Sequence, residues 1–358
     1  MRATRRALVC HRRRLLVAQP PARATQMAAP DQPVLRITAK DCGAGFFALM
    51  IYAVNQIIWA ESNGHASYVD FGQRCRDGRL NRYYDAGHGS NVWEYYFRPV
   101  STAVAAPTSL QLSTKQLFNL HHLSPDSVQT YPHGLYKALK VPRWRYDEGW
   151  HRTMRGRASR LLHRLVHLKP EPLRVVRNFY SQRVLSLGED RPALGLHLRG
   201  TDKLKNIGGR IVRPEEYHPL IKAYLEKRPN AILLLATDSP SFLAQMRATY
   251  GERIVVYDAL RSERNAFADK RVADNYKKGE DALVDALLLS CANYLIKPAS
   301  ALSEFSVYFN EPLHNHTYEL QYEVGLPNFA DALEAHLASG RDKARGFARC
   351  AEAMRTAE

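Results

Sequence analysis

The second half of the chain alternates short apolar runs with amphipathic stretches, a pattern that predicts a parallel sheet flanked by helices. Four apolar runs are typical of buried strands: residues 193–198, 231–236, 254–257 and 294–297. Helical patterns begin near Pro214, Ser239 and Gly279, and a last core helix is expected over residues 302–309. Strands that alternate with helices in this way indicate a doubly wound α/β domain.

The first half shows a strand, a glycine turn and a helix in succession. Residues 34–38 have a strand pattern, Gly43 and Gly45 lie in the turn, and an apolar helical pattern runs to about Ser62. A second strand is expected at residues 66–71. Backbone N–H groups at such a helix start can meet a phosphate, although the two glycines are equally explained by the tight turn itself.

The region between these two patterns is less regular. Residues 83–97 are rich in aromatic side chains, which would either stack on sugar rings or form the core beneath a long loop. His121 and His122 are interpreted as surface or packing residues, because no third ligand lies at metal-binding spacing. Residues 151–188 are expected to be helical and very basic, with an apolar stripe that is interrupted near Pro170.

The charge of the chain narrows the class of partner. Its 358 residues have a formal net charge of +16 and a pI near 9.7. This balance favours nucleic acid, anionic membranes or phosphate-bearing ligands. The basic regions have no aromatic residues interleaved as stacking platforms for bases and no zinc-finger or RNA-binding signature, so we expect no nucleic-acid partner. No apolar run approaches the roughly 18 residues of a membrane helix, so no transmembrane segment is expected.

Cysteine usage and the N-terminus leave the cellular compartment open. The five cysteines are scattered and form no C-x-x-C pair, so a structural zinc site and a dense disulfide framework are not expected. One or two disulfides between distant cysteines stay open. Residues 1–30 hold seven arginines and no acidic residue, as in a targeting or disordered extension. A single sequon, Asn315-His316-Thr317, permits a secretory location without establishing it.

Polar groups that follow the predicted strands give a candidate site. His197 and Arg199 lie two residues apart and therefore share one face of a strand. The carboxyl ends of parallel strands meet at one edge of the sheet, where we expect these two residues to be joined by others: Asp202, Lys203, Asp238 and Ser300. The arginine guanidinium group binds phosphate oxygens with two parallel hydrogen bonds, whereas the lysine ammonium group acts as a compact positive charge, so both residue types suit a diphosphate.

Three acidic or hydroxyl residues near this edge have alternative interpretations. Asp285 could accept hydrogen bonds from a base edge or a sugar hydroxyl, whereas Asp238 and Ser300 could each simply cap the helix that follows. No magnesium-binding D-x-D pattern is present, so we expect a metal-free site that neutralises a leaving diphosphate with Arg199 and Lys203.

The motifs resemble a known family when taken in order. H-L-R-G-T-D-K, R-P-E-E-Y, A-T-D-S-P, D-A-L-L-L-S-C-A-N-Y-L-I and A-S-A-L-S, over roughly residues 193–310, resemble the α-1,6-fucosyltransferase and nodulation fucosyltransferase superfamily. D-C-G-A-G-F-F near residue 41 is similar to the family's glycine loop. The resemblance implies an α/β fold of GT-B type, with two Rossmann-type domains facing a cleft. It also implies an inverting, metal-independent transfer of fucose from GDP-fucose to a glycan or protein acceptor, without a further cofactor.

The resemblance also implies roles for individual residues. Arg199 would contact the β-phosphate and stabilise the departing GDP, with Asp202 and Lys203 beside the sugar and the diphosphate. Within the donor site, His197 and Asp285 would recognise guanine or ribose and Ser300 would lie on the phosphate side. The donor-binding residues implied are Gly43, Gly45, His197, Asp238, Asp285 and Ser300.

With this resemblance, the chain is expected to divide into five segments: a basic N-terminal extension (1–30), an N-terminal Rossmann-like domain (31–150), a basic helical connection (151–190), a C-terminal nucleotide-sugar-binding domain (191–330) and a helical tail (331–358). Family members in eukaryotes work in the Golgi or the endoplasmic reticulum, but no membrane anchor is recognised in this sequence.

The chain departs from the family pattern at positions that affect chemistry. The glutamate regarded as the base in the α-1,6 enzymes aligns near Asn206-Ile207, where no acid is present, so Asp202 becomes the nearest candidate. Ala301-Leu302 replaces a serine-glutamine pair. Two alternatives therefore stay open: a glycosyltransferase that uses another nucleotide sugar, and a non-catalytic protein that binds a sugar or a phosphate.

Overall fold

The computed structural model describes residues 27–29, 31–39, 42–104, 106, 108–131, 145–188, 191–200, 211–264, 269, 273–322 and 324–340. Its strands over these residues are β1 (Val34–Thr38), β2 (Ala66–Asp70), β3 (Ala193–Leu198), β4 (Ile232–Thr237), β5 (Ile254–Val256), β6 (Tyr294–Lys297) and β7 (Thr317–Glu319). Its α-helices are α1 (Phe46–Ser62), α2 (Trp93–Tyr96), α3 (Thr114–His122), α5 (Glu148–Leu165), α6 (Pro170–Arg183), α7 (Pro214–Lys227), α8 (Pro240–Tyr250), α9 (Asn275–Ser290), α10 (Ala301–Phe309) and α11 (Phe329–Ala338).

The larger sheet is parallel and doubly wound, as the alternating pattern predicts. Its strand order is β5-β4-β3-β6-β7, with all neighbours parallel. The chain therefore winds outward in one direction from β3 to β5 and in the other from β6 to β7. The point where the direction reverses lies between β3 and β6, and ligands of such sheets bind beside this point at the carboxyl ends of the strands.

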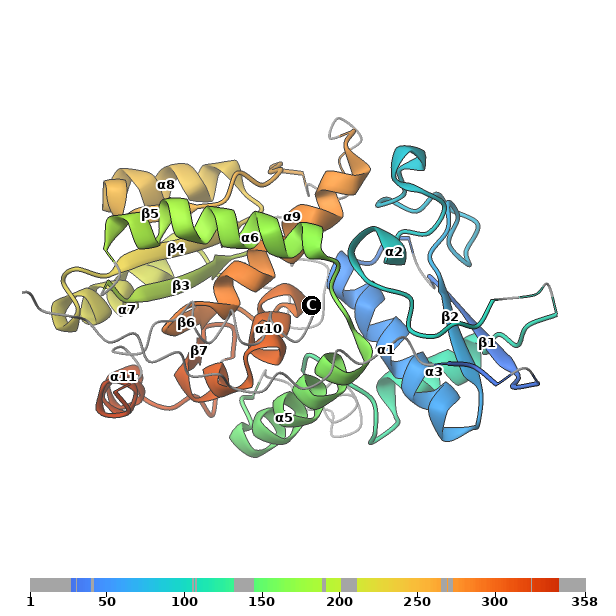
Figure 1. Ribbon diagram of the computed structural model, residues 1–358. Coiled ribbons are helices and arrows are strands. Elements are labelled where there is room, and N and C mark those ends of the chain that lie inside the picture. The colour runs from blue at the N-terminus through green and yellow to red at the C-terminus, as the bar shows by residue number, and fades with distance from the viewer. Residues whose placement is uncertain are drawn as a thin grey trace, which may run out of the picture.

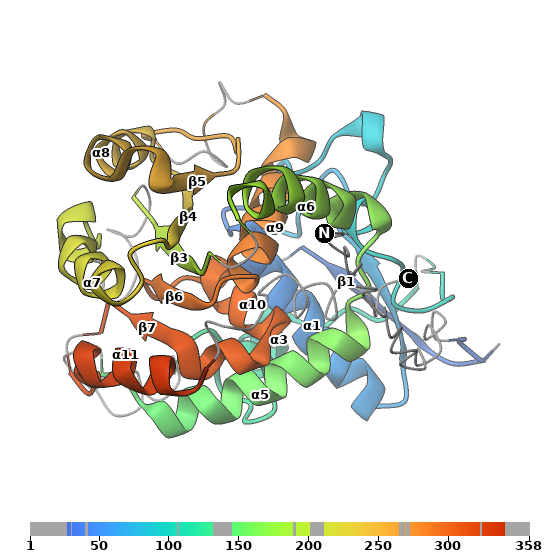
Figure 2. The same ribbon diagram turned by 60° about the vertical axis from the view of Figure 1, so that its left-hand side comes forward.

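Helices cover both faces of this sheet (Figures 1 and 2). Apolar side chains of β3 and β4 that point to one face pack against α7, α8 and α11. Side chains that point to the other face pack against α6 and α9. Gly195 in β3 allows the turn after α9 to approach closely, because a Cβ there would lie 2.8 Å from the Cβ of Ala292 in that turn. All residues of β3 and β4 are buried, which explains their continuous apolar runs.

The smaller sheet pairs β1 with β2 in parallel, and α1 is the helix between them. One hydrophobic cluster joins this unit to the large sheet, since it contains residues of β1, α1, α2, α6, α9 and α10. Within it, the rings of Phe47 in α1 and Phe305 in α10 lie 4.6 Å apart. Figures 1 and 2 show α10 between the large sheet and α1. The basic segment, α5 and α6, packs against α10 and α9 respectively.

Several sequence-based expectations are confirmed and others are refined. β1, β3 and β6 have the predicted bounds, and α9 begins four residues before the predicted start at Gly279. The aromatic residues around 93–97 are buried, which supports their interpretation as core. A disulfide joins Cys42 and Cys75. None of the helices in the described ranges combines the length and hydropathy of a bilayer-crossing helix.

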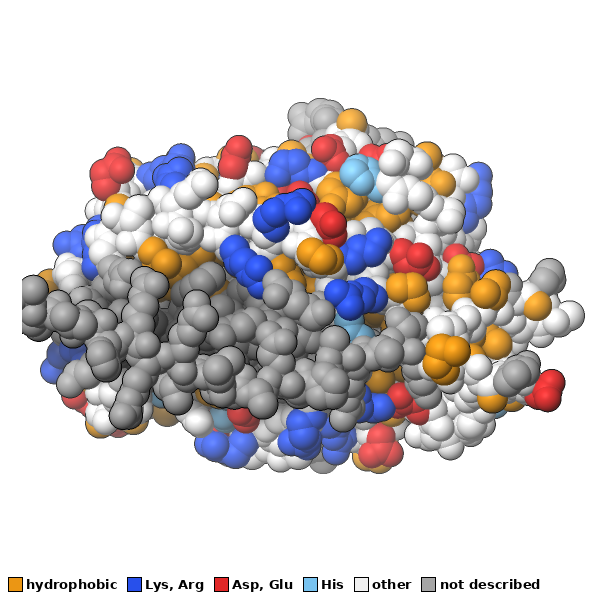
Figure 3. All heavy atoms as spheres, in the orientation of Figure 1, with side chains coloured by type: hydrophobic (Ala, Val, Ile, Leu, Met, Phe, Trp, Pro, Cys, Tyr) orange, Lys and Arg blue, Asp and Glu red, His pale blue; other side chains and the backbone are white. Residues whose placement is uncertain are grey.

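The surface in Figure 3 explains how the large positive charge is carried. Lys and Arg side chains on this face are interspersed with Asp and Glu rather than gathered into one continuous patch. Arg164 of α5, for example, pairs with Glu61 of α1 at 2.8 Å. Arg164 is exposed, so this charge of α5 belongs to the solvated surface.

Candidate functional site

A pocket of about 470 Å³ opens at the carboxyl ends of β3, β4 and β6. It therefore lies at the reversal point of the large sheet, and α1 with its preceding loop forms the opposite wall. Seven of the nine predicted site residues line it: Gly43, Gly45, His197, Arg199, Asp238, Asp285 and Ser300. The other two, Asp202 and Lys203, lie outside the described residues.

His197 and Arg199 reach the pocket from the end of β3. His197 is buried, whereas Arg199, one residue past the strand, is partly exposed. The hydroxyl of Tyr217 in α7 donates a hydrogen bond to the backbone carbonyl of His197 at 2.6 Å. This bond fixes the end of the strand, so that both side chains enter the pocket from one face.

Asp238, one residue past β4, holds the segment that follows Arg199. Its Oδ1 accepts a hydrogen bond from the backbone N–H of Gly200 at 2.8 Å. Gly200 is needed there, since a Cβ would lie 2.8 Å from the Cβ of Ser239. The N-cap of α8 is Ser239, whose side chain accepts from the N–H of Phe242, so the alternative in which Asp238 caps this helix is wrong.

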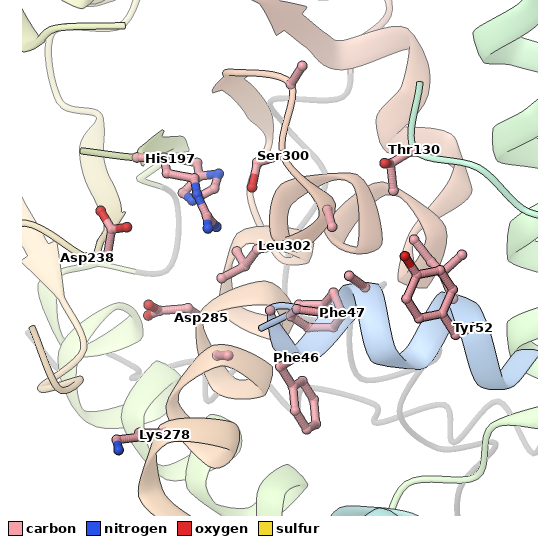
Figure 4. Close-up of a pocket in the computed structure, with 18 of the residues that line it drawn as sticks. Phe46, Phe47, Tyr52, Thr130, His197, Asp238, Lys278, Asp285, Ser300 and Leu302 are labelled. Atoms are coloured by element: carbon pink, nitrogen blue, oxygen red, sulfur yellow. The ribbon is translucent and has the colours of Figure 1, made fainter. Parts of the chain in front are cut away.

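Asp285 projects into the pocket from α9 (Figure 4). Its side chain is buried, and among the residues that the structure describes none donates a hydrogen bond to its carboxylate. Burial raises the pKa of Asp285 to about 8; the nearby Arg261 guanidinium opposes this rise and Asp281 adds to it. A buried carboxyl group with its pKa raised in this way keeps its proton at neutral pH. It then offers an O–H donor as well as an acceptor.

Asp281, one helical turn before Asp285, is occupied by the protein itself. Its Oδ2 accepts from the N–H of Leu260 at 2.7 Å, and its Oδ1 pairs with Lys277 at 2.6 Å. Burial raises the pKa of Asp281, although these hydrogen bonds oppose the rise. Asp281 therefore shapes the loop after β5, whereas the Asp285 carboxyl group remains available to a ligand.

Ser300 follows β6 and occupies the N-cap position of α10, but its side chain makes no capping hydrogen bond. Its hydroxyl oxygen is buried and has no hydrogen-bond partner among the described residues. Figure 4 shows this side chain pointing toward the space beside His197. Buried hydroxyls are rarely left unpaired, because the missing bond costs about 1–3 kcal/mol. The capping interpretation is wrong, and the geometry favours a ligand partner.

The opposite wall begins with the glycine loop. Gly43 and Gly45 both line the pocket, and Gly45 is the N-cap of α1. The disulfide between Cys42 and Cys75 ties this loop to the chain that follows β2. Phe46 and Phe47, the first residues of α1, anchor the helix in the shared core. The backbone at the start of α1 is therefore held rigidly across the pocket from Arg199.

The far end of the pocket contains residues that the sequence analysis missed. Figure 4 places Tyr52 and Thr130 on one side of the pocket and His197 and Asp238 on the other. Leu302 lies between these two groups. His121 also lines the pocket; it is buried and its ring lies 4.5 Å from that of Tyr52, in agreement with the packing interpretation.

The sequence feature that indicates this end of the pocket is Asn55, a polar residue within the apolar pattern of α1. Its amide exchanges two hydrogen bonds with the backbone of Val128, at 3.0 and 2.7 Å, and a third with Nδ1 of His121 at 3.2 Å. It thereby holds the 128–131 segment along the pocket.

Comparison with known proteins finds distant likeness only. No protein-family model and no curated protein matches the sequence. The NodZ α-1,6-fucosyltransferase structure soaked with GDP-fucose is similar at 13% identity, with a TM-score of 0.43, over 77% of this chain and 92% of that chain. For NodZ co-crystallised with GDP the values are 13%, 0.42, 77% and 91%, and for NodZ from Bradyrhizobium they are 13%, 0.42, 77% and 92%. These values describe a likeness in fold alone.

Proposed function

We propose that the protein is a glycosyltransferase that transfers fucose from GDP-fucose to a hydroxyl group of a glycan or protein acceptor, with inversion and without a metal ion. The proposal is supported by the ordered fucosyltransferase-like motifs between residues 193 and 310. In this proposal, residues 31–150 and 191–330 are the two Rossmann-type halves of a GT-B fold, and residues 151–190 connect them.

One observation carries the proposal. Arg199 follows β3, Asp285 lies in α9 and Ser300 follows β6, yet all three line one pocket at the reversal point of a doubly wound sheet. An arginine fork, a buried carboxyl group and an unpaired hydroxyl are the groups that a nucleoside diphosphate sugar needs. The fork matches phosphate oxygens, the carboxyl group matches a base edge or a ribose hydroxyl, and the serine hydroxyl can donate to a phosphate.

The chemistry follows from where charge develops. As the bond between the anomeric carbon and the diphosphate oxygen breaks, negative charge grows on GDP and the sugar becomes oxocarbenium-like. Arg199 and Lys203 neutralise that charge. Charged groups stabilise a transition state most effectively when they are already in position before the reaction begins. The acceptor oxygen attacks from the opposite face, which inverts the anomeric centre. Its proton passes to a base, which we assign to Asp202, the acid nearest to Arg199 in the motif.

The deciding experiment is a donor panel on the full chain. GDP-fucose, other GDP-sugars and UDP-sugars are incubated with mixed glycan and glycoprotein acceptors, with EDTA or with Mg²⁺, and released nucleotide is measured. We expect GDP release from GDP-fucose that EDTA does not reduce and that Arg199→Ala lowers by about a hundredfold or more. Release only from another donor would identify a different nucleotide sugar. Binding of GDP by calorimetry without any turnover would instead indicate a non-catalytic binding protein.

A further inference from the structure

A group of buried charges lies behind the candidate site and has no role in the proposal above. Its members are each at most 2% exposed and come from four different elements: Arg155 in α5, Lys297 in β6, Glu304 in α10 and Glu319 in β7. None of them lines the pocket. Two cations and two anions make the group electrically balanced.

The four side chains satisfy one another. Arg155 donates two hydrogen bonds to Glu304, from Nε at 2.6 Å and from Nη2 at 3.0 Å. It also donates to Glu319 and, at 3.0 Å, to Nδ1 of His314. Lys297 Nζ lies 2.7 Å from Glu304 and 2.8 Å from Glu319. Burial opposes the ionisation of Glu304, but Arg155 and Lys297 outweigh this effect and lower its pKa.

Such a group is not explained by stability. Taking four charges out of water costs several kcal/mol for each ion, and apolar side chains of similar volume often give equal or greater stability. A network of buried ion pairs instead fixes the relative positions of its side chains, because all of its hydrogen bonds are satisfied in one arrangement only. The question is therefore which part of the molecule this arrangement fixes.

The network encloses the turn that carries Ser300. Lys297 is the last residue of β6, three positions before Ser300, and its Nζ also lies 3.5 Å from the carbonyl oxygen of Pro298. Glu304 lies one turn after Ser300, and its N–H donates to the carbonyl of Ser300 at 2.9 Å. Both ends of the segment from 298 to 303 are thus attached to Arg155 and Glu319, which belong to elements that do not line the pocket.

We propose that Arg155, Lys297, Glu304 and Glu319 are positioning residues for Ser300: they hold the Pro298–Ser300 turn so that the Ser300 hydroxyl points at the donor's diphosphate. The inference rests on the proposed function, because the diphosphate is its ligand. It goes further in assigning donor affinity to charges that never touch the donor.

The test is a double-mutant cycle on donor KM. Lys297→Met combined with Glu319→Gln removes one cation and one anion, and leaves the two-bond Arg155–Glu304 pair balanced. Alone, this change is expected to raise the KM for the donor about as much as Ser300→Ala does, roughly tenfold for a lost hydrogen bond to a charged group. Added to Ser300→Ala, it is expected to raise the KM no further, because the hydroxyl that it positions is already gone.

Leu333→Ala is the matched control. Leu333 is a buried residue of α11 that packs on the opposite side of the large sheet and does not line the pocket. Its truncation is expected to lower the Tm while leaving donor KM unchanged, which separates lost stability from lost positioning. If the charge-balanced variant does not fold, Glu319→Gln alone enters the same cycle, since it keeps the shape of the side chain.

Two results would overturn the proposal: an unchanged donor KM, or effects that multiply with Ser300→Ala. If the wild-type chain turns over no donor at all, the proposed function fails separately. The positioning role is then decided by amide hydrogen exchange of residues 299–304. Faster exchange in the charge-balanced variant but not in Leu333→Ala supports the role, and equal exchange in both variants rejects it.

Discussion

Asp238 and Gly200 are joined across the ends of β4 and β3: the Asp238 carboxylate accepts the Gly200 N–H at 2.8 Å. The bond fixes the backbone immediately after Arg199. We expect Asp238→Ala to weaken donor binding by about tenfold or more, the cost of losing a hydrogen bond to a charged group. Asp238→Asn keeps an oxygen that can accept the same N–H and is expected to be much milder. GDP affinity measured by calorimetry checks the order.

Equal loss in both Asp238 variants would contradict this structural role. It would instead mean that the negative charge acts on the ligand itself, since asparagine retains the acceptor but not the charge.

Arg199 is expected to matter more for turnover than for folding. Arg199→Ala should lower kcat by about a hundredfold or more, as removal of one preorganised charge-stabilising donor does in other enzymes. Arg199→Lys keeps the charge but loses the two-pronged geometry, so its activity should fall between those of wild type and alanine. Steady-state nucleotide release checks both. Near-normal turnover in Arg199→Ala would reject the leaving-group role.

Ser300 should behave as a group reserved for a ligand. Removing a buried hydroxyl that has no partner in the described structure relieves a cost in the unliganded protein, so Ser300→Ala should keep or raise the Tm. The same substitution should raise donor KM about tenfold. Thermal unfolding and kinetics on one preparation test the pair of effects. A lowered Tm with unchanged KM would mean that the hydroxyl serves the fold.

Asp285 should make stability depend on pH. Its folded-state pKa of about 8 lies above the value of about 3.9 of an unfolded aspartate, so the folded state keeps a proton that the unfolded state releases. This stabilising contribution is complete below the unfolded pKa and is lost as pH rises through about 8.

The comparison for this effect is Asp285→Asn, which is neutral at every pH. Between about pH 5 and pH 8.5 the wild type should lose about 1 kcal/mol or more of unfolding free energy relative to the variant. Urea unfolding at the two pH values measures this difference. Parallel curves would show that the Asp285 carboxyl group is ionised when folded.

The Cys42–Cys75 disulfide should affect both stability and donor binding. It closes a loop of 33 residues, for which chain entropy predicts a contribution on the order of 3–4 kcal/mol. Cys42→Ala with Cys75→Ala should therefore lower the Tm and, by releasing the backbone at Gly43, raise the donor KM. A lower Tm with the wild-type KM would remove the glycine loop from the donor site.

The large sheet and its ligand edge were predictable because their signals are local. Continuous apolar runs mark buried parallel strands, and the polar residue after each run lies at the carboxyl edge whatever the details of packing. This reasoning placed Arg199, Asp238 and Ser300 at one edge of the sheet, and all three line the pocket. The apolar pattern does not predict the three-residue strand β7, because this strand is short and ends in the charged residue Glu319. Glu319 is buried only because Arg155 and Lys297, from other elements, neutralise its charge.

The errors at the level of single residues have tertiary causes. The sequence pattern predicts a helix that begins at Gly279, but this residue lies inside α9, where a Cβ would come within 2.5 Å of the Tyr96 hydroxyl. The glycine therefore makes room for a ring from a segment far away in the sequence. Likewise, the Asp238–Gly200 bond spans 38 positions, so no local pattern distinguishes it from a helix cap.

The shared core also limits how a substrate can enter. β1, α1, α9 and α10 contribute to one hydrophobic cluster, with Phe47 and Phe305 in contact beside the pocket. Swinging the two sheets apart as rigid bodies would expose these rings to water, at about 25 cal/mol for each Å² of apolar surface. Ligand exchange is therefore expected to proceed by rearrangement of loops at the rim, and its rate should respond to loop substitutions rather than to changes at a hinge.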